Sequence, residues 1–171
     1  MAMFFTSDTH FGDHRTLNIH KRPFPSVAEM DEAMIAGWNA AVGAEDEVWH
    51  LGDFARKVAD VPGLLSRLNG RKHLLRGNND PRAIGDVKGW ASVGDYHELD
   101  EGGHRLILCH YPFRSWNGQN RKAINLHGHS HGKLKPMPRQ LDVGVDARGF
   151  RPVTLSQLLN DRGPIRIPSR P

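Results

Sequence analysis

The segment Phe4-Phe5-Thr6-Ser7-Asp8-Thr9-His10 joins an apolar run directly to residues that can bind a metal ion. The run over residues 2–7 is short and ends in polar residues, which predicts a buried β-strand. In α/β proteins, ligands bind at the carboxyl ends of the strands. The segment therefore predicts an α/β fold with a site where this first strand ends.

Four further apolar runs end in the same way. They lead into Gly52-Asp53, Gly77-Asn78, His110 and the segment His127-Gly128-His129-Ser130-His131. Each short motif is weak by itself, since Asp-x-His also occurs at Asp95-Tyr96-His97. The ordered set, with every member at a strand end, is specific, and it predicts five strand ends that converge on one site.

The rest of the chain predicts a mixed sheet system. Ser26-x-x-Glu29 is a capping box before apolar residues at helical spacing, which predicts a helix over residues 26–42. Leucines predict short helices around residues 64–68 and 155–159. The expected strands are residues 47–51, 71–76, 92–99, 105–109, 123–126 and 140–145, with a hairpin turn at Gly102-Gly103. This order of elements is typical of an α/β protein.

The composition is that of an ordinary soluble globule, with 171 residues, 38% of them hydrophobic and 25% charged. We expect residues 1–160 to form a single domain and residues 161–171 to form an Arg- and Pro-containing tail. No apolar run approaches the roughly 18 residues that span a bilayer, and residues 1–5 lack the basic start of a signal peptide. Cys109 is the single cysteine, which excludes an internal disulfide. These features predict a cytoplasmic protein without a membrane partner.

Histidine and charge are distributed unevenly. The chain holds 11 histidines, a residue type that serves as a metal ligand and as a proton carrier near neutral pH. The net charge of +4 arises within residues 148–171, and residues 1–147 are balanced. A solvated basic tail accounts for this excess, so the charge indicates little about partners.

The ligand types at the strand ends fit a dinuclear metal centre. Carboxylate oxygen and imidazole nitrogen suit Mn, Fe, Zn, Co or Ni, and the absence of thiolates argues against soft-metal sites. An aspartate can bridge two ions, and two close cations acidify a bridging water. The glycines before Asp53, Asn78 and His129 permit tight turns and close approach of the backbone.

The series Asp8-x-His10, Gly52-Asp53, Gly77-Asn78, His110 and Gly128-His129-x-His131 resembles the signature of the calcineurin-like metallophosphoesterases. The residues around the first and last motifs are similar to those of compact, stand-alone bacterial or phage members. The resemblance implies a metallophosphoesterase-type two-sheet β sandwich flanked by helices, with four layers in the order α/β/β/α. It also implies hydrolysis of a phosphodiester or phosphomonoester by a hydroxide that bridges two divalent metal ions, with manganese as the first candidate.

The resemblance implies a role for each motif residue. The residues implied to bind the first metal ion are Asp8, His10 and His131. Those implied to bind the second are Asn78, His110 and His129, with Asp53 as the bridge. The expected catalytic residues are Asp53, Asn79, Asp80 and His127.

One position departs from the family pattern. Where the family reads Gly-Asn-His followed by an acid, this chain reads Gly77-Asn78-Asn79-Asp80. The family's histidine contacts substrate phosphate and can protonate the leaving group, held by the acid that follows. Asn79 can donate a hydrogen bond but cannot act as a general acid near neutral pH. We therefore expect activated or diester substrates, unless His14, His50 or His127 supplies the proton.

Substrate contacts are expected from His14, Arg56 and Asn79. His14 follows the first motif on a loop expected to border the cleft, and Arg56 could meet a phosphate bidentately. His127 is expected either beside the ligands or packed behind them. The histidines expected to be surface or structural residues are His20, His73, His97 and His104.

Other functions compete with this interpretation. A non-catalytic, protein-binding scaffold of the same fold is the alternative; Asn79 favours it and the complete ligand set argues against it. A metallo-β-lactamase-type hydrolase would need Asp-His after the second histidine, where this chain has Ser130-His131. A nuclease falls within the phosphodiesterase reading, although no stripe of interleaved basic and aromatic residues favours nucleic acid.

Overall fold

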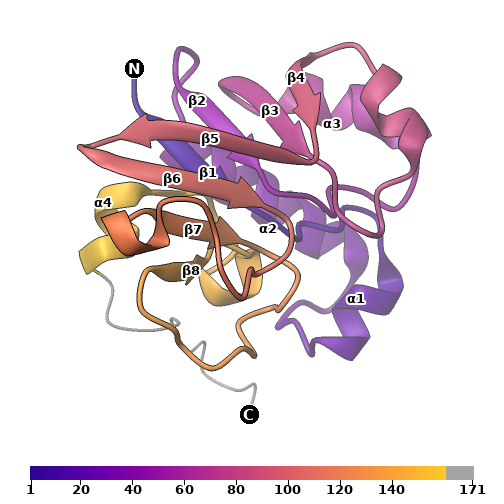
Figure 1. Ribbon diagram of the computed structural model, residues 1–171. Coiled ribbons are helices and arrows are strands. Elements are labelled where there is room, and N and C mark those ends of the chain that lie inside the picture. Colours follow the sequence, from indigo (N-terminus) through magenta and orange to yellow (C-terminus); the bar gives the residue numbers. More distant parts are fainter. Residues whose placement is uncertain (161–171) are drawn as a thin grey trace.

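A computed structural model describes residues 1–160, and the expected tail at residues 161–171 lies outside them (Figure 1). The strands are β1 (Met3–Thr6), β2 (Glu47–His50), β3 (Arg71–Leu75), β4 (Trp90–Gly94), β5 (Tyr96–Glu101), β6 (His104–Cys109), β7 (Ile124–His127), β8 (Gln140–Asp142) and β9 (Val153–Thr154). The α-helices are α1 (His14–Ile19), α2 (Val27–Ala41), α3 (Val61–Arg67) and α4 (Leu155–Asn160). Short 3-10 helices lie at Val58–Asp60, Arg82–Asp86, Gln119–Arg121 and Val145–Ala147.

The strands form two sheets. The first has the order β4-β3-β2-β1-β9, in which β1 to β4 run parallel and β9 is antiparallel to β1. The second has the order β5-β6-β7-β8, in which β5 and β6 form an antiparallel hairpin and β6, β7 and β8 run parallel. Just beyond β1, Ser7 pairs with Gly144, which follows β8. The two sheets therefore meet where their parallel strands end.

The first sheet buries both faces. Phe4 and Val48 point toward the helices and pack in a cluster with Trp38 and the other apolar residues of α2. Phe5 and Trp49, one position further along their strands, point toward the second sheet. This alternation follows from the two-residue period of a strand. It places one core on each side of the sheet.

The outer face of the second sheet carries a smaller cluster. Ile107 of β6 packs there against Trp116 and Ala123, from the segment that joins β6 to β7. The molecule is thus a mixed α/β sandwich of two sheets with helices on its flanks, as expected (Figure 1). The capping box is also confirmed, since the Ser26 side chain accepts from the backbone N–H of Glu29 at 3.2 Å and α2 starts one residue later.

The single strand expected at residues 92–99 is wrong. The structure has two strands there: β4 pairs with β3 in the first sheet, and β5 pairs with β6 in the second. Asp95 lies at the crossing, and its carboxylate accepts two hydrogen bonds of 2.8 Å from Arg76. Alternating polarity has the same period in either sheet, so the pattern cannot reveal that the chain changes sheets.

Two other boundaries differ from expectation. Residues 14–19 form a helix, α1, where a loop was expected, with Asp13 as the N-cap that accepts from Arg15 N at 2.9 Å. Only Thr16 and Leu17 of α1 are buried, so its sequence carries too little apolar periodicity to predict it. The strand expected at 140–145 ends at Asp142, because a 3-10 turn begins at Val145.

His50 is a buried structural histidine at the end of β2. Its Nε2 lies 2.9 Å from the Thr9 hydroxyl, which in turn donates to the Phe54 carbonyl at 2.8 Å. Gly52 N donates to Nδ1 at 3.2 Å, so the network assigns the single ring proton to Nε2. Burial, together with the charges of His110 and His10, lowers the pKa of His50 to about 3. The ring is therefore neutral and ties together the loops after β1 and β2.

We predict that His50 makes stability fall with acidity. Its pKa drops from 6.5 in the unfolded chain to about 3 in the folded protein, so its stabilising contribution is complete above pH 6.5 and declines below it. The variant His50→Gln keeps a side-chain N–H donor but cannot titrate. The slope of its free energy of unfolding against pH should therefore be smaller than that of the wild type by up to about 1.4 kcal/mol per pH unit. Urea unfolding between pH 5 and 7.5 measures it, with His104→Gln as control. Equal slopes in His50→Gln and the wild type would contradict the prediction.

Candidate metal centre

The side chains expected at five strand ends come together at one edge of the sandwich. One group, Asp8, His10 and His131, offers ligand atoms that all lie within 4.8 Å of one another, and so does a second, Asp8, Asp53 and His110. Asn78 Oδ1 adjoins the second group, at 3.0 Å from His110 Nε2 and 2.9 Å from His129 Nδ1. The structure therefore gathers all seven expected metal ligands.

Five of these seven residues have a left-handed backbone. The φ angles of Asp8, His10, Asp53, His129 and His131 lie between 48° and 66°. Residues other than glycine rarely adopt this region, and the strain costs about 1–3 kcal/mol each. Backbone hydrogen bonds hold the loops in place, for example from Asp8 N to Gly52 O at 2.9 Å and from His10 N to Asp53 O at 3.0 Å. Strain concentrated in this way is typical of functional sites.

Two glycines of the motifs are required by close approach. A Cβ atom at Gly77 would overlap the Asp53 carboxylate, and one at Gly128 would overlap the Ser7 hydroxyl and the Asp8 carboxylate. The loops therefore pack directly against the acidic side chains, as the glycine spacing predicted.

Hydrogen-bond acceptors face one another at the centre. His110 Nδ1 lies 2.7 Å from the Leu51 carbonyl and must carry the proton, so the Nε2 lone pair faces Asn78 Oδ1. His131 Nδ1 lies 2.7 Å from Asp146 Oδ2, so its Nε2 lone pair faces the Asp8 carboxylate at 3.8 Å. A divalent cation accepts electron pairs from such a donor set, whereas without one the acceptors repel. The residues present therefore fit a metal ion.

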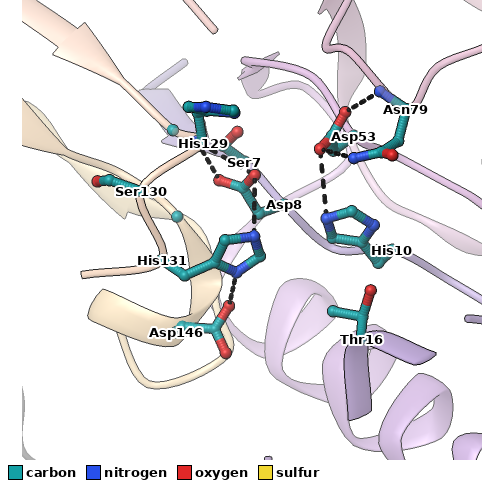
Figure 2. A network of polar contacts seen from close by, with 12 residues as sticks. Ser7, Asp8, His10, Thr16, Asp53, Asn79, His129, Ser130, His131 and Asp146 are labelled. Carbon is teal, nitrogen blue, oxygen red and sulfur yellow. Dashed lines mark hydrogen bonds and ion pairs between the residues drawn. The ribbon is translucent and has the colours of Figure 1, made fainter. Parts of the chain in front are cut away.

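His10 supports the same reading. Its Nε2 is buried and has no hydrogen-bond partner within residues 1–160, although Asp53 Oδ2 lies 3.4 Å away (Figure 2). Burial lowers the pKa of His10 to about 4, against the opposite effect of Asp53. Burial also raises the pKa of Asp8, and the charges of Asp142 and Asp53 raise it further. Two crowded carboxylates beside neutral imidazoles form an environment that a cation would stabilise.

Asp80 and Asn79 form hydrogen bonds with Asp53. The Asp80 carboxylate accepts from the backbone N–H groups of Asp53, Phe54 and Gly77 at 2.7 to 2.8 Å, which joins the loops after β2 and β3. Burial raises the pKa of Asp80 to about 6. Asn79 donates to both oxygens of Asp53, from its backbone N–H at 2.8 Å and from its side-chain amide at 2.7 Å (Figure 2). Asn79 thus positions the Asp53 carboxylate, and Asp80 positions the backbone that carries it.

A buried ion pair that the sequence did not indicate supports His131. Asp146 accepts from His131 Nδ1 and receives a two-pronged contact from Arg22, at 2.9 and 2.8 Å. The Arg22 guanidinium also donates to the carbonyls of Asp8 and Thr9, at 2.6 and 2.9 Å. Burial alone would raise the pKa of Asp146, but His131 and Arg22 hold it well below its usual range. Arg22 and Asp146 are 124 positions apart, so no local pattern could reveal the pair.

His20, which was expected to be a surface or structural residue, lies against a candidate metal ligand. Its ring stacks on that of His131 with the centroids 3.6 Å apart and the planes at 10°. His20 Nδ1 lies 3.0 Å from Lys133 Nζ, an ammonium that can only donate, so this nitrogen is the acceptor. Burial lowers the pKa of His20 to about 4. His20 is thus an uncharged ring that stacks on a candidate metal ligand, His131.

The other expected site residues lie further from the candidate ligands. His127 is buried at the end of β7, with Nδ1 2.8 Å from the Gly128 carbonyl. His14 is exposed at the start of α1, 3.3 Å from the Asn18 amide. Arg56 is exposed, three residues after Asp53. Within residues 1–160, none of the three belongs to either metal-ligand group.

Known proteins resemble this chain over most of its length. It is 32% identical over 181 residues to the gene 66 protein of Mycobacterium phage D29, covering 85% of this chain and 88% of the phage protein. It is 28% identical over 167 residues to the uncharacterized protein MJ1445 of Methanocaldococcus jannaschii, covering 92% of this chain and 89% of that protein. No family model matches the chain.

Solved structures share its fold. A protein of unknown function from Aquifex aeolicus superposes with a TM-score of 0.73 at 21% identity, covering 91% of this chain and 96% of that one. The nuclease MPE of Pseudomonas putida superposes with a TM-score of 0.51 at 24% identity, covering 75% and 61% of the two chains. The chain thus shares the two-sheet α/β fold of these two structures. Of the described helices, none is both long enough and apolar enough to cross a membrane.

We predict that Asp146 sets metal affinity through His131. Removing its carboxylate in Asp146→Ala frees the His131 ring and leaves Arg22 without its buried partner, so manganese affinity should fall about 10–100-fold. Asp146→Asn, which keeps an acceptor for His131, should lose less. Calorimetric titration with manganese measures both, with the exposed Asp95→Ala as the matched control. Wild-type affinity in Asp146→Ala would refute the assigned role.

Proposed function

The chain belongs to the family of the mycobacteriophage gene 66 proteins, and we propose that it is a calcineurin-like phosphoesterase that uses two divalent metal ions. One observation carries the proposal: carboxylate, amide and imidazole acceptors from five strand ends face one another around a common space. This donor set suits Mn, Fe, Zn, Co or Ni, and we take manganese as the first candidate.

Seven residues would hold the ions. Asp8, His10 and His131 would hold one, and Asn78, His110 and His129 the other, with Asp53 shared between them. When bound, such ions lower the pKa of a water to make a nucleophile and neutralise charge on the phosphate. The phosphate ester would bind at the open side of the centre, where Asn78 and His129 are exposed.

The chain's own residues fix the geometry of this centre. Asp80 holds the backbone of the loops that carry Asp53 and Gly77. Asn79 fixes both oxygens of Asp53. Asp146 keeps the His131 proton on Nδ1 and leaves Nε2 free for an ion, as the Leu51 carbonyl does for His110.

The arrangement favours leaving groups that depart without a proton. Asn79 stands where the family's acid histidine would be, and its amide is directed at Asp53. An amide cannot supply a proton near neutral pH. Aryl esters and other activated diesters need protonation least. The activity of the Pseudomonas putida relative, a nuclease, leads us to propose phosphodiesters ahead of monoesters for this chain.

We predict metal-dependent hydrolysis of bis(p-nitrophenyl) phosphate, faster than that of p-nitrophenyl phosphate. Asp53→Asn should lower kcat by about 100-fold or more, because it removes the shared carboxylate charge. Release of p-nitrophenol with each divalent ion measures the rate, with Asp95→Asn as the control. Bound metal without turnover of either ester would refute the proposal and favour the non-catalytic scaffold.

A second prediction concerns position 79. Asn79→His would supply the missing acid, so hydrolysis of methyl p-nitrophenyl phosphate should change little while that of dimethyl phosphate, whose leaving group is poor, should gain most. General acids contribute about 10²–10⁴-fold, which is the upper range for the gain. The ratio of the two rates is the readout, because it cancels any loss from freeing Asp53. An unchanged ratio would show that the missing histidine does not limit the reaction.

A further inference from the structure

A cavity of about 1070 Å³ opens beside the candidate metal centre. His131 and Asp146 form the wall that it shares with the centre, and α1 and residues 20–28 form much of the rest. A phosphate held at the centre would carry its ester arms away from the ligands. The cavity is larger than a second recess beside the site and is at the upper end of the size range of small-molecule sites.

The lining of the cavity is of mixed polarity and contains an apolar cluster. Leu17, Phe24, Val27 and Phe150 line it, and the rings of Phe24 and Phe150 meet edge to face with centroids 4.9 Å apart. The His20 ring, stacked on His131, also lines the cavity. Such a lining suits a planar, largely apolar group, which would lose its contact with water there.

Cations add a second chemical feature. The exposed Lys21 and Lys133 both line the cavity, and Lys133 is held beside His20 at 3.0 Å. Arg22 contributes no free charge because Asp146 already pairs with it. Ammonium groups beside an aromatic lining match a ligand that combines a ring with hydrogen-bond acceptors.

The second recess has different chemistry. It measures about 570 Å³ and adjoins Gly77, with Arg76, Arg82 and Tyr111 in its lining. Arg76 is paired with Asp95 there, and Tyr111 packs edge-on against His110 and His129. Its lining lacks an apolar cluster like that of Phe24 and Phe150, so an aromatic arm fits the first cavity better.

We propose that the cavity beside His131 binds the nucleoside arm of a nucleotide diester, with the base against Phe24 and the oxygen acceptors of the base or sugar near Lys133. The inference rests on the proposed function, since the metal centre would hold the phosphate that carries this arm. It narrows the proposed substrate from any phosphate ester to a diester in which the group that stays on the phosphate after hydrolysis is a nucleoside. The leaving group then departs away from α1.

Binding tests the cavity without turnover. Calorimetric titration of the manganese-loaded protein should show thymidine 5′-monophosphate binding about tenfold more tightly than methyl phosphate, the scale of one stacked base. Phe24→Leu, which keeps apolar volume but removes the ring, and Lys133→Ala should each reduce that preference at least threefold. Tyr96→Leu and Lys88→Ala are the controls outside the cavity. Equal affinities for the two phosphates, or an unchanged preference in both cavity variants, would overturn the proposal.

Turnover measurements test nucleoside binding in the cavity separately from the proposed phosphoesterase activity. Thymidine 5′-(p-nitrophenyl phosphate) and methyl p-nitrophenyl phosphate share a leaving group and differ only in the retained arm. We expect kcat/KM to favour the thymidine ester about tenfold, and Phe24→Leu to reduce that ratio. Hydrolysis of both esters without preference would overturn the proposed nucleoside binding in the cavity and leave the proposed phosphoesterase activity intact. Selective binding without hydrolysis of either would support the cavity and overturn the function.

Discussion

Asp8 and Asp53 bring two buried carboxylates beside imidazole nitrogens that have no proton to donate, and the surrounding structure is arranged to hold them there. Charge of one sign in a buried site repels strongly, which is why burial and its neighbours raise the pKa of Asp8. Backbone N–H groups offset part of this charge, and Arg22 adds a buried positive charge from behind. A cation between the acceptors would offset the rest.

The sandwich makes this crowding possible. Five parallel strands from two sheets end at one edge, and the pairing of Ser7 with Gly144 brings those ends together. At that edge the loops after β1, β2 and β7 turn through left-handed residues such as Asp8, Asp53 and His129. The strain is carried by loops anchored to rigid strands, and Asp80 and Arg22 connect those loops to one another.

Asn79 and His20 hold candidate metal ligands in place and would not supply a proton in the proposed reaction. Asn79 stands where the signature that this chain resembles has its acid histidine, and its amide donates to Asp53. His20 has an ionisable ring, yet it lies neutral against His131 and beside Lys133. Both residues therefore contact candidate ligands, and in the proposed phosphoesterase any proton for the leaving group would come from another group. An enzyme without a general acid would depend on how well it positions its substrate. The cavity at Phe24 would contribute to that positioning.

By itself, the sequence determined the α/β class, the helix after Ser26 and the set of residues that gather at the centre, because strand periodicity and strand-end chemistry are local features. Only the tertiary structure decided that residues 90–101 divide between two sheets, that Arg22 meets Asp146 and that Asn79 turns toward Asp53. Those outcomes depend on contacts between distant segments, which the pattern of polar and apolar residues does not encode. The same holds for the cavity, whose walls at Phe24 and Phe150 are far apart in the chain and meet only in the folded protein.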